Sequence, residues 1–405
     1  MQPAAPGGGL SGGEAPLAGL RVLDLSRVLA GPFAGRMLCD LGADVVKVEP
    51  PAGDVTRLWG AERGGISGYF NQQNAGKRGM CVDLGRPEGV ALVLALAERA
   101  DILIENFRPD VMGRLGLGWE VLSARNPGLV MLSISGFGAD GPESRRAAYA
   151  PIIHAESGIM ARQAEIGGNR PVDMSLSVAD TNASLHGLVA VLAALHLRGR
   201  TGVGQHIDMA MIDATLVTDD HVHFALDDSY DLKNMPSEVW GSAAGPIVIA
   251  GDFRFLWRQL TEVMGVTDPT PADAGLAEKI AARRRATRRF LEETCADRAA
   301  VIDAMDRMNI AWGDVRTTAG ALDLPTVRHR GTFTTVDDRA GGQRGVTQSP
   351  YRFSAADARV RGGAPRQGEH NEDVLADWLG ADRALLDRFA PALLPAPGEP
   401  AGGGV

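Results

Sequence analysis

The sequence predicts an α/β fold built on a parallel, doubly wound sheet. Two observations carry this prediction: short apolar segments alternate with helical stretches from Leu20 onward, and the stretches between them run to about ten residues or more. Strands linked by helices of that length lie parallel, in a sheet that helices cover on both faces. Ligands of such sheets bind at the carboxyl ends of the strands. The residues that follow each strand are therefore the first candidates for a site.

The elements of this sheet can be placed in order along the first part of the chain. The first strand is followed by Gly31 and Pro32, and proline is tolerated in the first turn of a helix. The expected strands are residues 21–25, 44–48, 81–84, 101–105 and 129–135, and the expected helices between them are residues 33–41 and 87–99.

Beyond Pro151 the chain is more helical. A shift to a turn-rich composition over residues 227–251 indicates that the middle of the chain forms a separate, smaller domain. Strand-like alternation returns over residues 332–353. The expected helices are residues 152–161, 182–197, 209–226, the basic and alanine-rich 277–295, and the shorter 372–379 and 383–389.

Composition narrows the function classes. The chain has 405 residues, with 41 Lys and Arg against 50 Asp and Glu, so its net charge is −9. That balance argues against nonspecific binding of nucleic acid, and an anionic ligand would need local basic residues to hold it. The uninterrupted apolar runs reach about eight residues, against the ~20 needed to span a bilayer, so no membrane partner is expected.

Cysteine usage and the chain ends predict a cytoplasmic protein. Cys39, Cys81 and Cys295 are odd in number and far apart, which excludes a disulfide framework and a CxxC zinc site. Residues 1–16 are rich in Gly, Pro and Ala and lack the basic start and apolar segment of a signal peptide, so a disordered lead is expected. Residues 395–405 have a similar composition and are expected to form a flexible tail.

The common catalytic motifs are missing from the sequence. His221 and His223 form an HxH pair without a third ligand at suitable spacing, so both are taken as structural histidines and no metal is expected. Neither a GxSxG nucleophile elbow nor a phosphate-binding Walker motif occurs.

One carboxylate stands out from the rest. Asp180 ends an apolar run and directly precedes the long helix expected from about Asn182. Spacing alone favours an N-cap, because Asp is preferred at that position. The alternative is a reactive carboxylate that the helix N-terminus keeps ionised, with free N–H groups that can receive an oxyanion.

Basic residues recur at the ends of the expected strands. Arg27, Lys77, Arg78, Arg108 and Arg114 would each be a solvated surface charge if taken alone. Their recurrence in an acidic protein indicates an anionic ligand such as a nucleotide phosphate. The two glycine-flexed turns of residues 136–142 form either a loop over that ligand or an ordinary surface turn.

These motifs together resemble the class III CoA-transferases, the family of formyl-CoA transferase and carnitine CoA-transferase. The similarity extends over nearly the whole chain, from about Leu17 to Leu379. The segments that carry it are residues 17–26, 30–32, 41–49, 74–78, 105–109, 114–116, 135–138, 202–205 and 368–371.

The resemblance implies an acyl-CoA:carboxylate CoA-transferase that uses acyl-CoA and a small carboxylic acid as substrates and needs no tightly bound cofactor. It implies an interlocked homodimer in which two ring-like chains thread each other. The Rossmann-like large domain would be assembled from residues 17–225 and 331–394, with a smaller α/β domain over residues 226–330 between them.

The resemblance also assigns site residues. Asp180 falls where transferases of this family keep their catalytic aspartate, and Tyr149 is the second catalytic candidate. Leu29 and Pro50 stand where formyl-CoA transferase has a polar residue and a CoA-binding arginine, so the acid partners stay open. The phosphates and adenine of coenzyme A would lie near Lys77, Asn106, Phe107 and Arg114, with Arg27 and Arg108 as further basic contacts, and Val28 and Ala30 would line the pantetheine and thioester end.

Two other functions remain open at this point. The same fold hosts α-methylacyl-CoA racemases, which carry a histidine where this chain has Tyr149. His154 lies about one and a half helical turns further on and is a poor substitute for that histidine. One of the two general bases of a racemase is therefore missing, which favours the transferase. A non-catalytic CoA-binding homologue is the third possibility, since a fold does not guarantee its chemistry.

Overall fold

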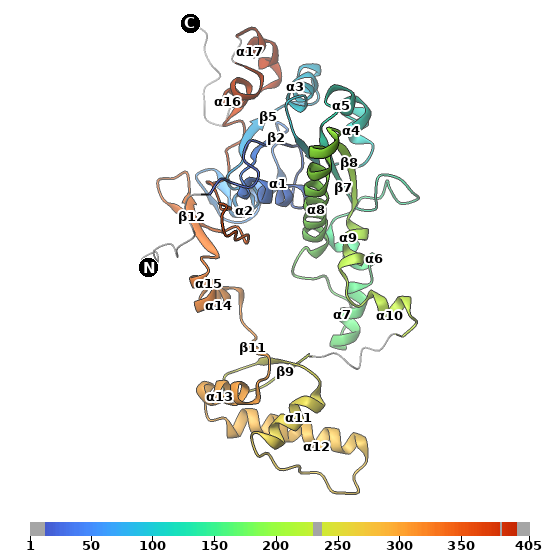
Figure 1. Ribbon diagram of the computed structural model, residues 1–405, viewed down its shortest axis with the longest axis vertical. Coiled ribbons are helices and arrows are strands. Elements are labelled where there is room, and N and C mark those ends of the chain that lie inside the picture. Colours follow the sequence, from blue (N-terminus) through green and yellow to red (C-terminus); the bar gives the residue numbers. More distant parts are fainter. Residues whose placement is uncertain (1–12, 230–236, 381–382, 395–405) are drawn as a thin grey trace. The chain divides into compact units, whose positions relative to one another are not determined.

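The computed structural model describes residues 13–229, 237–380 and 383–394, which fall into two compact units (Figure 1). The first unit contains the chain up to Val222 and from Arg328 onward, and the second contains the residues from His223 to Val327. These bounds differ by three residues at each end from the 226–330 expected for the small domain. The predicted tail and residues 1–12 of the predicted lead lie outside the described residues. Within the rest of the lead, the Glu14 carbonyl accepts a hydrogen bond from the Asp357 N–H at 3.4 Å.

The centre of the first unit is a six-stranded sheet in the order β5-β2-β1-β6-β7-β8, and every neighbouring pair is parallel. The prediction of a mixed α/β fold with a central parallel sheet is therefore confirmed (Figure 1). The strands are β1 (Arg21–Asp24), β2 (Asp44–Glu49), β5 (Arg78–Cys81), β6 (Ile102–Glu105), β7 (Val130–Ser135) and β8 (Gln205–Ala210).

Two strands differ from their expected positions. The predicted strand at residues 81–84 is wrong, because Arg78 to Cys81 are the residues that pair with β2. Gly79 is required there, since a Cβ would lie 2.8 Å from the Arg366 carbonyl oxygen. The sixth strand, β8, was not predicted, and its last two residues were assigned to a helix.

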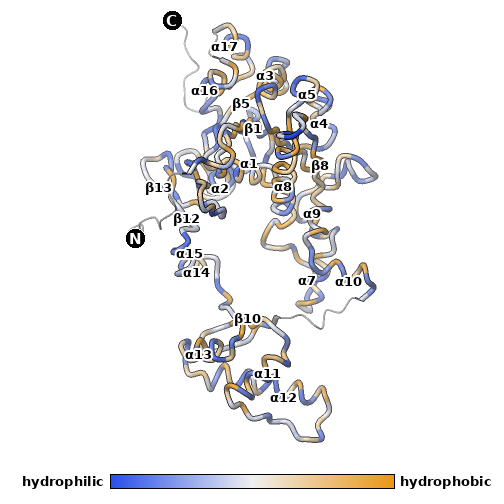
Figure 2. The backbone as a smooth tube through the Cα atoms, viewed as in Figure 1, coloured by the Kyte–Doolittle hydropathy of each residue, from blue (hydrophilic) through white to orange (hydrophobic). Residues whose placement is uncertain are grey.

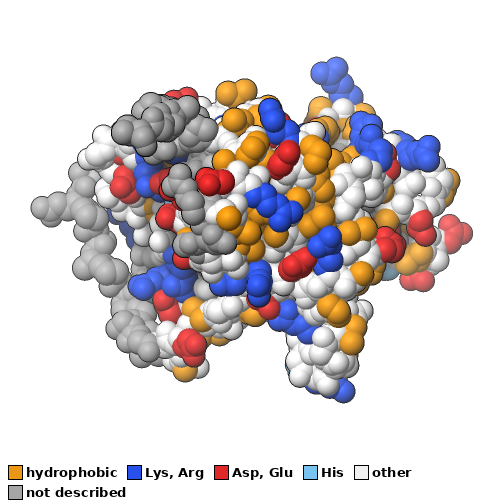
Figure 3. Space-filling model, turned by 90° about the horizontal axis from the view of Figure 1, so that it is seen from above, with side chains coloured by type: hydrophobic (Ala, Val, Ile, Leu, Met, Phe, Trp, Pro, Cys, Tyr) orange, Lys and Arg blue, Asp and Glu red, His pale blue; other side chains and the backbone are white. Residues whose placement is uncertain are grey.

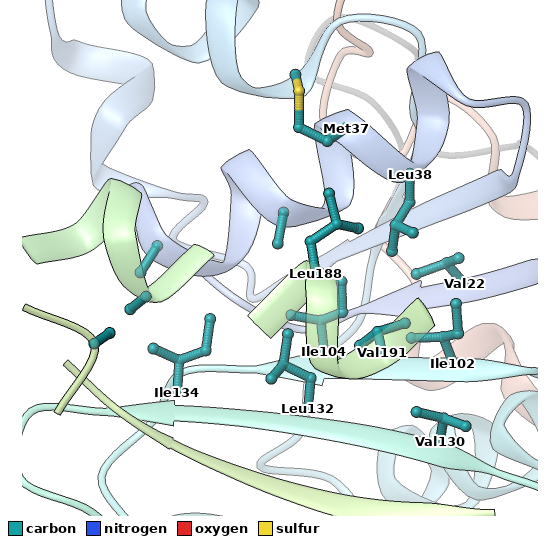
Figure 4. Close-up of a cluster of buried hydrophobic side chains, with 14 of the residues drawn as sticks. Val22, Met37, Leu38, Ile102, Ile104, Val130, Leu132, Ile134, Leu188 and Val191 are labelled. Carbon is teal, nitrogen blue, oxygen red and sulfur yellow. The ribbon is translucent and has the colours of Figure 1, made fainter. Parts of the chain in front are cut away.

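Helices cover both faces of the sheet. On one face α1 (Ala30–Asp40) and α8 (Val178–Thr201) pack through side chains such as Leu38, Leu188 and Val191 against alternate strand residues (Figure 4). The other face packs against α3 (Pro87–Ala97), α5 (Trp119–Arg125) and the C-terminal segment. Consecutive residues of a strand point to opposite faces of the sheet. Val22 therefore belongs to the apolar cluster on the face covered by α1 and α8, whereas Leu23 belongs to the cluster on the face covered by α3 and α5.

Helix α8 is the longest element and begins earlier than expected, at Val178 instead of about Asn182. It is long and apolar enough to cross a membrane by length and composition (Figure 2). In this fold one side of α8 packs against α1, α9 and β7, while several of its apolar side chains stay exposed.

Two of the expected helices are each divided into shorter elements. The expected helix 152–161 is divided at Gly158, whose φ of 82° lies in the left-handed region. The expected helix 209–226 is replaced by the end of β8 and two short helices. Further segments of the first unit are α6 (Ala150–Glu156), α7 (Ile159–Gly167), α9 (Met211–Thr218), α2 (Gly68–Asn74), α4 (Val111–Arg114), the single turn η1 (Val55–Leu58) and the hairpin of β3 (Glu62–Arg63) with β4 (Ile66–Ser67). Helix α10 (Val222–Leu226) begins at the last residue of this part and continues into the second unit.

The C-terminal segment returns to the sheet of the first unit. The Asn371 amide oxygen accepts a hydrogen bond from Cys81 N–H at 3.0 Å, and the His370 N–H donates to the Gly79 carbonyl at 2.9 Å. These bonds attach the segment to β5. Its elements are the hairpin of β12 (Phe333–Asp337) and β13 (Gln343–Thr347), α16 (Asn371–Val374), η4 (Leu375–Leu379), α17 (Arg383–Phe389) and η5 (Ala390–Ala392). Before this segment, α14 (Thr318–Leu322) belongs to the second unit, and α15 (Pro325–His329) spans the boundary between the two units.

The second unit has its own apolar core, which includes Trp257, Leu260 and Leu291. Its sheet is antiparallel, in the order β11-β10-β9. The elements are β9 (Ser237–Trp240), β10 (Ile247–Ala250), α11 (Phe253–Glu262), α12 (Leu276–Arg289), η3 (Phe290–Thr294), α13 (Arg298–Met308) and β11 (Trp312–Asp314).

Candidate functional site

The candidate site lies where the strand order reverses. Successive strands are added on one side of β1 as far as β5 and on the other side from β6 to β8, and ligands of open α/β sheets bind beside the carboxyl ends at such a point. The loop after β1 meets Asn106, which follows β6: the Arg27 N–H donates to the Asn106 amide oxygen, and the Asn106 amide donates to the Arg27 carbonyl, both at 2.8 Å.

Asp180 lies at the N-terminal ends of three helices. It is the third residue of α8, while Ala30 and Ala150, the first residues of α1 and α6, hydrogen-bond its carboxylate through the backbone. Ser177 is the N-cap of α8, so the N-cap interpretation of Asp180 is wrong. Because free N–H groups and helix dipoles favour negative charge at a helix N-terminus, the site can hold a carboxylate or an oxyanion.

Burial controls the charge of this carboxylate. Asp180 is 9% exposed, and loss of solvent raises its pKa to about 6, while the nearby N–H groups of Ala150 and Ala30 act to lower the pKa. A pKa of about 6 leaves the group mostly ionised at neutral pH and more basic than an exposed aspartate. A nucleophilic carboxylate benefits from both properties.

His154 is the neighbour that the sequence analysis set aside. The imidazole is fully buried on α6, its Nε2 lies 3.2 Å from the Ala179 N–H, and its Nδ1 lies 2.9 Å from the Asp173 carboxylate. Nε2 accepts from an N–H, so Nδ1 carries the proton and donates to Asp173. With both nitrogens engaged, His154 fixes the start of α8 and is not free to exchange a substrate proton.

One aromatic residue near Asp180, Tyr69, was also missed, together with the Trp59 ring that contacts it. Tyr69 lies on α2, and burial together with the negative charges of Asp180 and Asp54 raises the pKa of its phenol to about 12. The phenol therefore stays protonated and can donate a hydrogen bond. Its ring meets Trp59 edge-on, with 5.0 Å between the ring centroids. Residues 51–73 gave no expected element or motif, so only the fold reveals this pair.

Tyr149 is placed beside the site but faces solvent. It is the residue before α6, directly before Ala150, and 59% of its surface is exposed. The loop of residues 136–143, which precedes Tyr149 in the chain, lines a surface hollow of about 310 Å³ together with α6 and α9. Asp140, Glu143 and Glu156 contribute carboxylates to that hollow, and Arg146 pairs with Glu143 and with Glu156, each at 2.5 Å.

The predicted basic contacts divide into two groups. Arg27, Arg108 and Arg114 are exposed, and Arg114 pairs with Asp110 at 3.0 Å. Lys77 differs from the expectation, because its ammonium is buried and hydrogen-bonds Asp24, the Pro32 carbonyl and Asn74 at 2.8–2.9 Å. Lys77 thus lies inside the protein, where a phosphate does not reach it.

On the face drawn in Figure 3, Lys and Arg side chains are interspersed with Asp and Glu. Phe107 is partly buried against α3 and α5, and its N–H donates to the Glu105 carboxylate at 2.8 Å. Across the described ranges, no three His, Cys, Asp or Glu side chains converge as metal ligands do.

Comparison with known proteins shows which family and which solved structures this chain is similar to. The family described as CoA-transferase family III matches residues 17–371. A succinate–glutarate CoA-transferase of Agrobacterium fabrum is 34% identical over 91% of this chain and 97% of its own length. A succinyl-CoA–D-citramalate CoA-transferase of Chloroflexus aurantiacus is 33% identical over 92% and 96%. The crystal structure of a CaiB/BaiF family protein from Brucella suis superposes with a TM-score of 0.78 at 33% identity, over 90% of this chain and 100% of that one.

Proposed function

Because the chain belongs to CoA-transferase family III, we propose that it moves coenzyme A from an acyl-CoA thioester to a free carboxylic acid through covalent intermediates on Asp180. The observation that carries the proposal is the position of Asp180, a buried carboxylate at the N-terminal ends of α1, α6 and α8.

The reaction follows from this carboxylate. An Asp180 oxygen attacks the carbonyl carbon of the donor thioester, the C–S bond breaks, and coenzyme A leaves as a thiolate beside a mixed anhydride. The thiolate then attacks the aspartyl carbonyl, which releases the donor acid and leaves an aspartyl thioester. The acceptor carboxylate runs the two steps in reverse and restores free Asp180. Each tetrahedral oxyanion can be stabilised by backbone N–H groups.

We further propose succinyl-CoA as donor and a small dicarboxylate as acceptor. The support is chemical, because succinate, glutarate and citramalate in the names of the two relatives are all dicarboxylic acids. The test is a mass-spectrometric exchange assay with succinyl-CoA, acetyl-CoA and longer acyl-CoA donors against a mixture of mono- and dicarboxylic acids. Tight CoA binding without exchange onto any acid would instead indicate a non-catalytic homologue.

The racemase alternative requires a second general base. Both ring nitrogens of His154 are engaged by Ala179 and Asp173, and Tyr149 stands at the position where racemases carry histidine. Incorporation of deuterium at the α-carbon of an acyl-CoA, in D₂O and without an acceptor acid, would favour the racemase over the transferase.

The coenzyme A contacts are part of the proposal. The loop with Arg27, Val28 and Ala30 and the residues Asn106 and Phe107 meet at the switch point, and the exposed Arg108 and Arg114 are cations within the same unit. Lys77 contributes indirectly by holding this region together. No metal or tightly bound cofactor enters the proposed chemistry. The three cysteines are free and buried, which suits the cytoplasm that we propose as its location.

Activity should depend on the ionisation of Asp180. With the pKa at about 6, kcat/KM should be nearly constant above pH 7 and should fall about tenfold per pH unit below 6, since only the carboxylate attacks. The stability effect has the opposite sign. A raised pKa means that the folded state binds this proton more tightly, so Asp180 favours folding below about pH 4 and loses that contribution as the pH rises through 6.

The measurement is a profile of kcat/KM from pH 5 to 8, with circular dichroism recorded at each pH to separate titration from unfolding. A rate that does not change between pH 5 and 7 would contradict the assignment of Asp180 as nucleophile.

We propose that the chain forms the interlocked homodimer expected for the family. Support comes from an apolar face of α8, formed by Leu185, Val189, Leu192 and Leu197, whose exposed fractions range from 37% to 65%. Exposed apolar surface of this kind marks protein interfaces, and a second copy would cover it.

Light scattering should give about 85 kDa, twice the 42.7 kDa of one chain. Interlocked rings cannot exchange subunits while folded. Tagged and untagged dimers that are mixed should therefore remain homodimers, and should form heterodimers only after unfolding and refolding. Val189→Glu should reduce the dimer fraction, whereas Val121→Glu on α5 should not. Rapid exchange of native subunits would rule out interlocking, and a 43 kDa particle would rule out the dimer.

A further inference from the structure

The loop between β1 and α1 contains a strained residue. Val28 has a φ of 69°, in the left-handed region that β-branched residues rarely occupy. A backbone conformation of this kind persists only where surrounding contacts impose it, and such sites are frequently functional. The contacts that impose it therefore become candidates for a functional role.

Four backbone groups of residues 26–28 are bound by side chains from other parts of the first unit. The Ser26 carbonyl accepts from the Lys47 ammonium at 2.8 Å, and Arg27 is held on both sides by Asn106. The Val28 N–H donates to the Asp54 carboxylate at 3.1 Å.

Asp54 is itself fixed in a buried network. One carboxylate oxygen pairs with the Lys47 ammonium at 3.2 Å, and both side chains are almost fully buried. The other oxygen accepts from the N–H and the hydroxyl of Thr56, at 3.0 Å and 2.8 Å. The Asp54 N–H donates to Glu49, which Arg57 pairs at 2.5 Å. Asp54 is therefore rigid, ionised and unable to follow the loop if Val28 relaxes.

The position of Val28 has a consequence for Asp180. Ala30, two residues later, begins α1 and hydrogen-bonds the Asp180 carboxylate through its backbone, and its carbonyl accepts from the Ser184 hydroxyl of α8 at 2.5 Å. A change in the backbone at Val28 would turn the Ala30 N–H away from the carboxylate.

We propose that Asp54, held by Lys47, is a positioning residue that keeps Val28 in its left-handed conformation and so keeps the Ala30 N–H directed at Asp180. The effect on catalysis rests on the proposed function, whereas the effect on the backbone does not.

The first test measures strain without any activity. Glycine adopts positive φ freely, so Val28→Gly should raise Tm or leave it unchanged. Val203→Gly, at an exposed valine outside the positive-φ set, should lower Tm because of the added backbone freedom of the unfolded chain. The two shifts should differ by roughly 2–5 °C. Equal losses of Tm in the two variants would overturn the claim that Val28 is strained.

The second test measures coupling between Asp54 and Val28. Asp54→Asn keeps the size of the side chain. If the amide oxygen stays on Thr56, the amide NH₂ group faces the Val28 N–H, and that N–H loses its hydrogen-bond acceptor. It should lower kcat of CoA exchange by about 10- to 100-fold with a smaller change in KM for acyl-CoA. In the Val28→Gly background the same substitution should cost about threefold, because glycine needs no restraint to hold the conformation.

Each outcome can be assigned. An equal loss of kcat in both backgrounds, with both proteins folded, would overturn the positioning role while leaving the transferase intact. If the chain has no exchange activity at all, the proposed function fails. The coupling between Asp54 and Val28 can then still be measured from the urea unfolding midpoints of the unchanged protein, Asp54→Asn, Val28→Gly and the double variant. If Asp54→Asn does not fold, recovery of folding by Val28→Gly supports the proposal, and no recovery contradicts it.

Discussion

Replacing Asp180 with asparagine is expected to lower kcat for CoA exchange by ~10³-fold or more, because a neutral amide cannot form the anhydride and thioester intermediates. The substitution keeps the size of the side chain, so the fold should survive. Exchange of label between an acyl-CoA and its free acid measures the effect. Asp213→Asn, which changes an exposed aspartate on α9, should retain full exchange and serves as the matched control.

The covalent intermediate can be detected directly. Hydroxylamine added during turnover should convert the aspartyl thioester to a hydroxamate, found by mass spectrometry on the peptide that contains Asp180. The adduct should require both the acyl-CoA donor and an aspartate at this position. Substantial exchange by Asp180→Asn, or an adduct that forms equally in that variant, would show that the acyl group is carried elsewhere.

Strands were predicted correctly where a run of apolar residues marks them, and they were missed where polar residues or glycine interrupt such a run. Residues 21–25 and 101–105 each contain three apolar residues, all buried in the core, and match β1 and β6 closely. Strand β8 begins with the polar residues Gln205 and His206 and has Asp208 at its centre, and β5 begins with Arg78 and Gly79. Both strands are specified by their neighbours, through pairing and close backbone approach, more than by their own composition.

The candidate site was predictable only in part. Asp180 was identified through the family resemblance, since spacing alone favoured a cap. The donors around it could not be found in the sequence, because Ala30 and Ala150 contribute backbone N–H groups that any residue could supply. His154 and Tyr69 reach the site through the packing of α6 and α2. Lys77 illustrates the opposite error, since a lysine after a turn suggests an exposed cation and this one is buried.

Lys77→Met should reduce stability strongly while leaving coenzyme A affinity nearly unchanged in the folded fraction. The ammonium and the Asp24 carboxylate are both fully buried and 2.8 Å apart, and Asp24 is also bound to the Ser26 N–H at 3.0 Å. Removing one partner of a buried pair leaves an uncompensated charge, at a cost of about 3–5 kcal/mol. Urea unfolding of the variant should show a correspondingly lower midpoint.

A pair of further variants separates this structural role from phosphate binding. Asp24→Asn combined with Lys77→Met removes the isolated charge and should recover part of the lost stability, because the desolvation cost of a buried carboxylate disappears. Arg114→Met should behave in the opposite way, since its pair with Asp110 is exposed on both sides and such pairs contribute about 0–1 kcal/mol. Its unfolding midpoint should hardly move, while KM for acyl-CoA should rise if it contacts a phosphate. An unchanged midpoint with a raised KM for Lys77→Met would return Lys77 to the phosphate site, because only a lysine that leaves Asp24 and faces the ligand could give that combination.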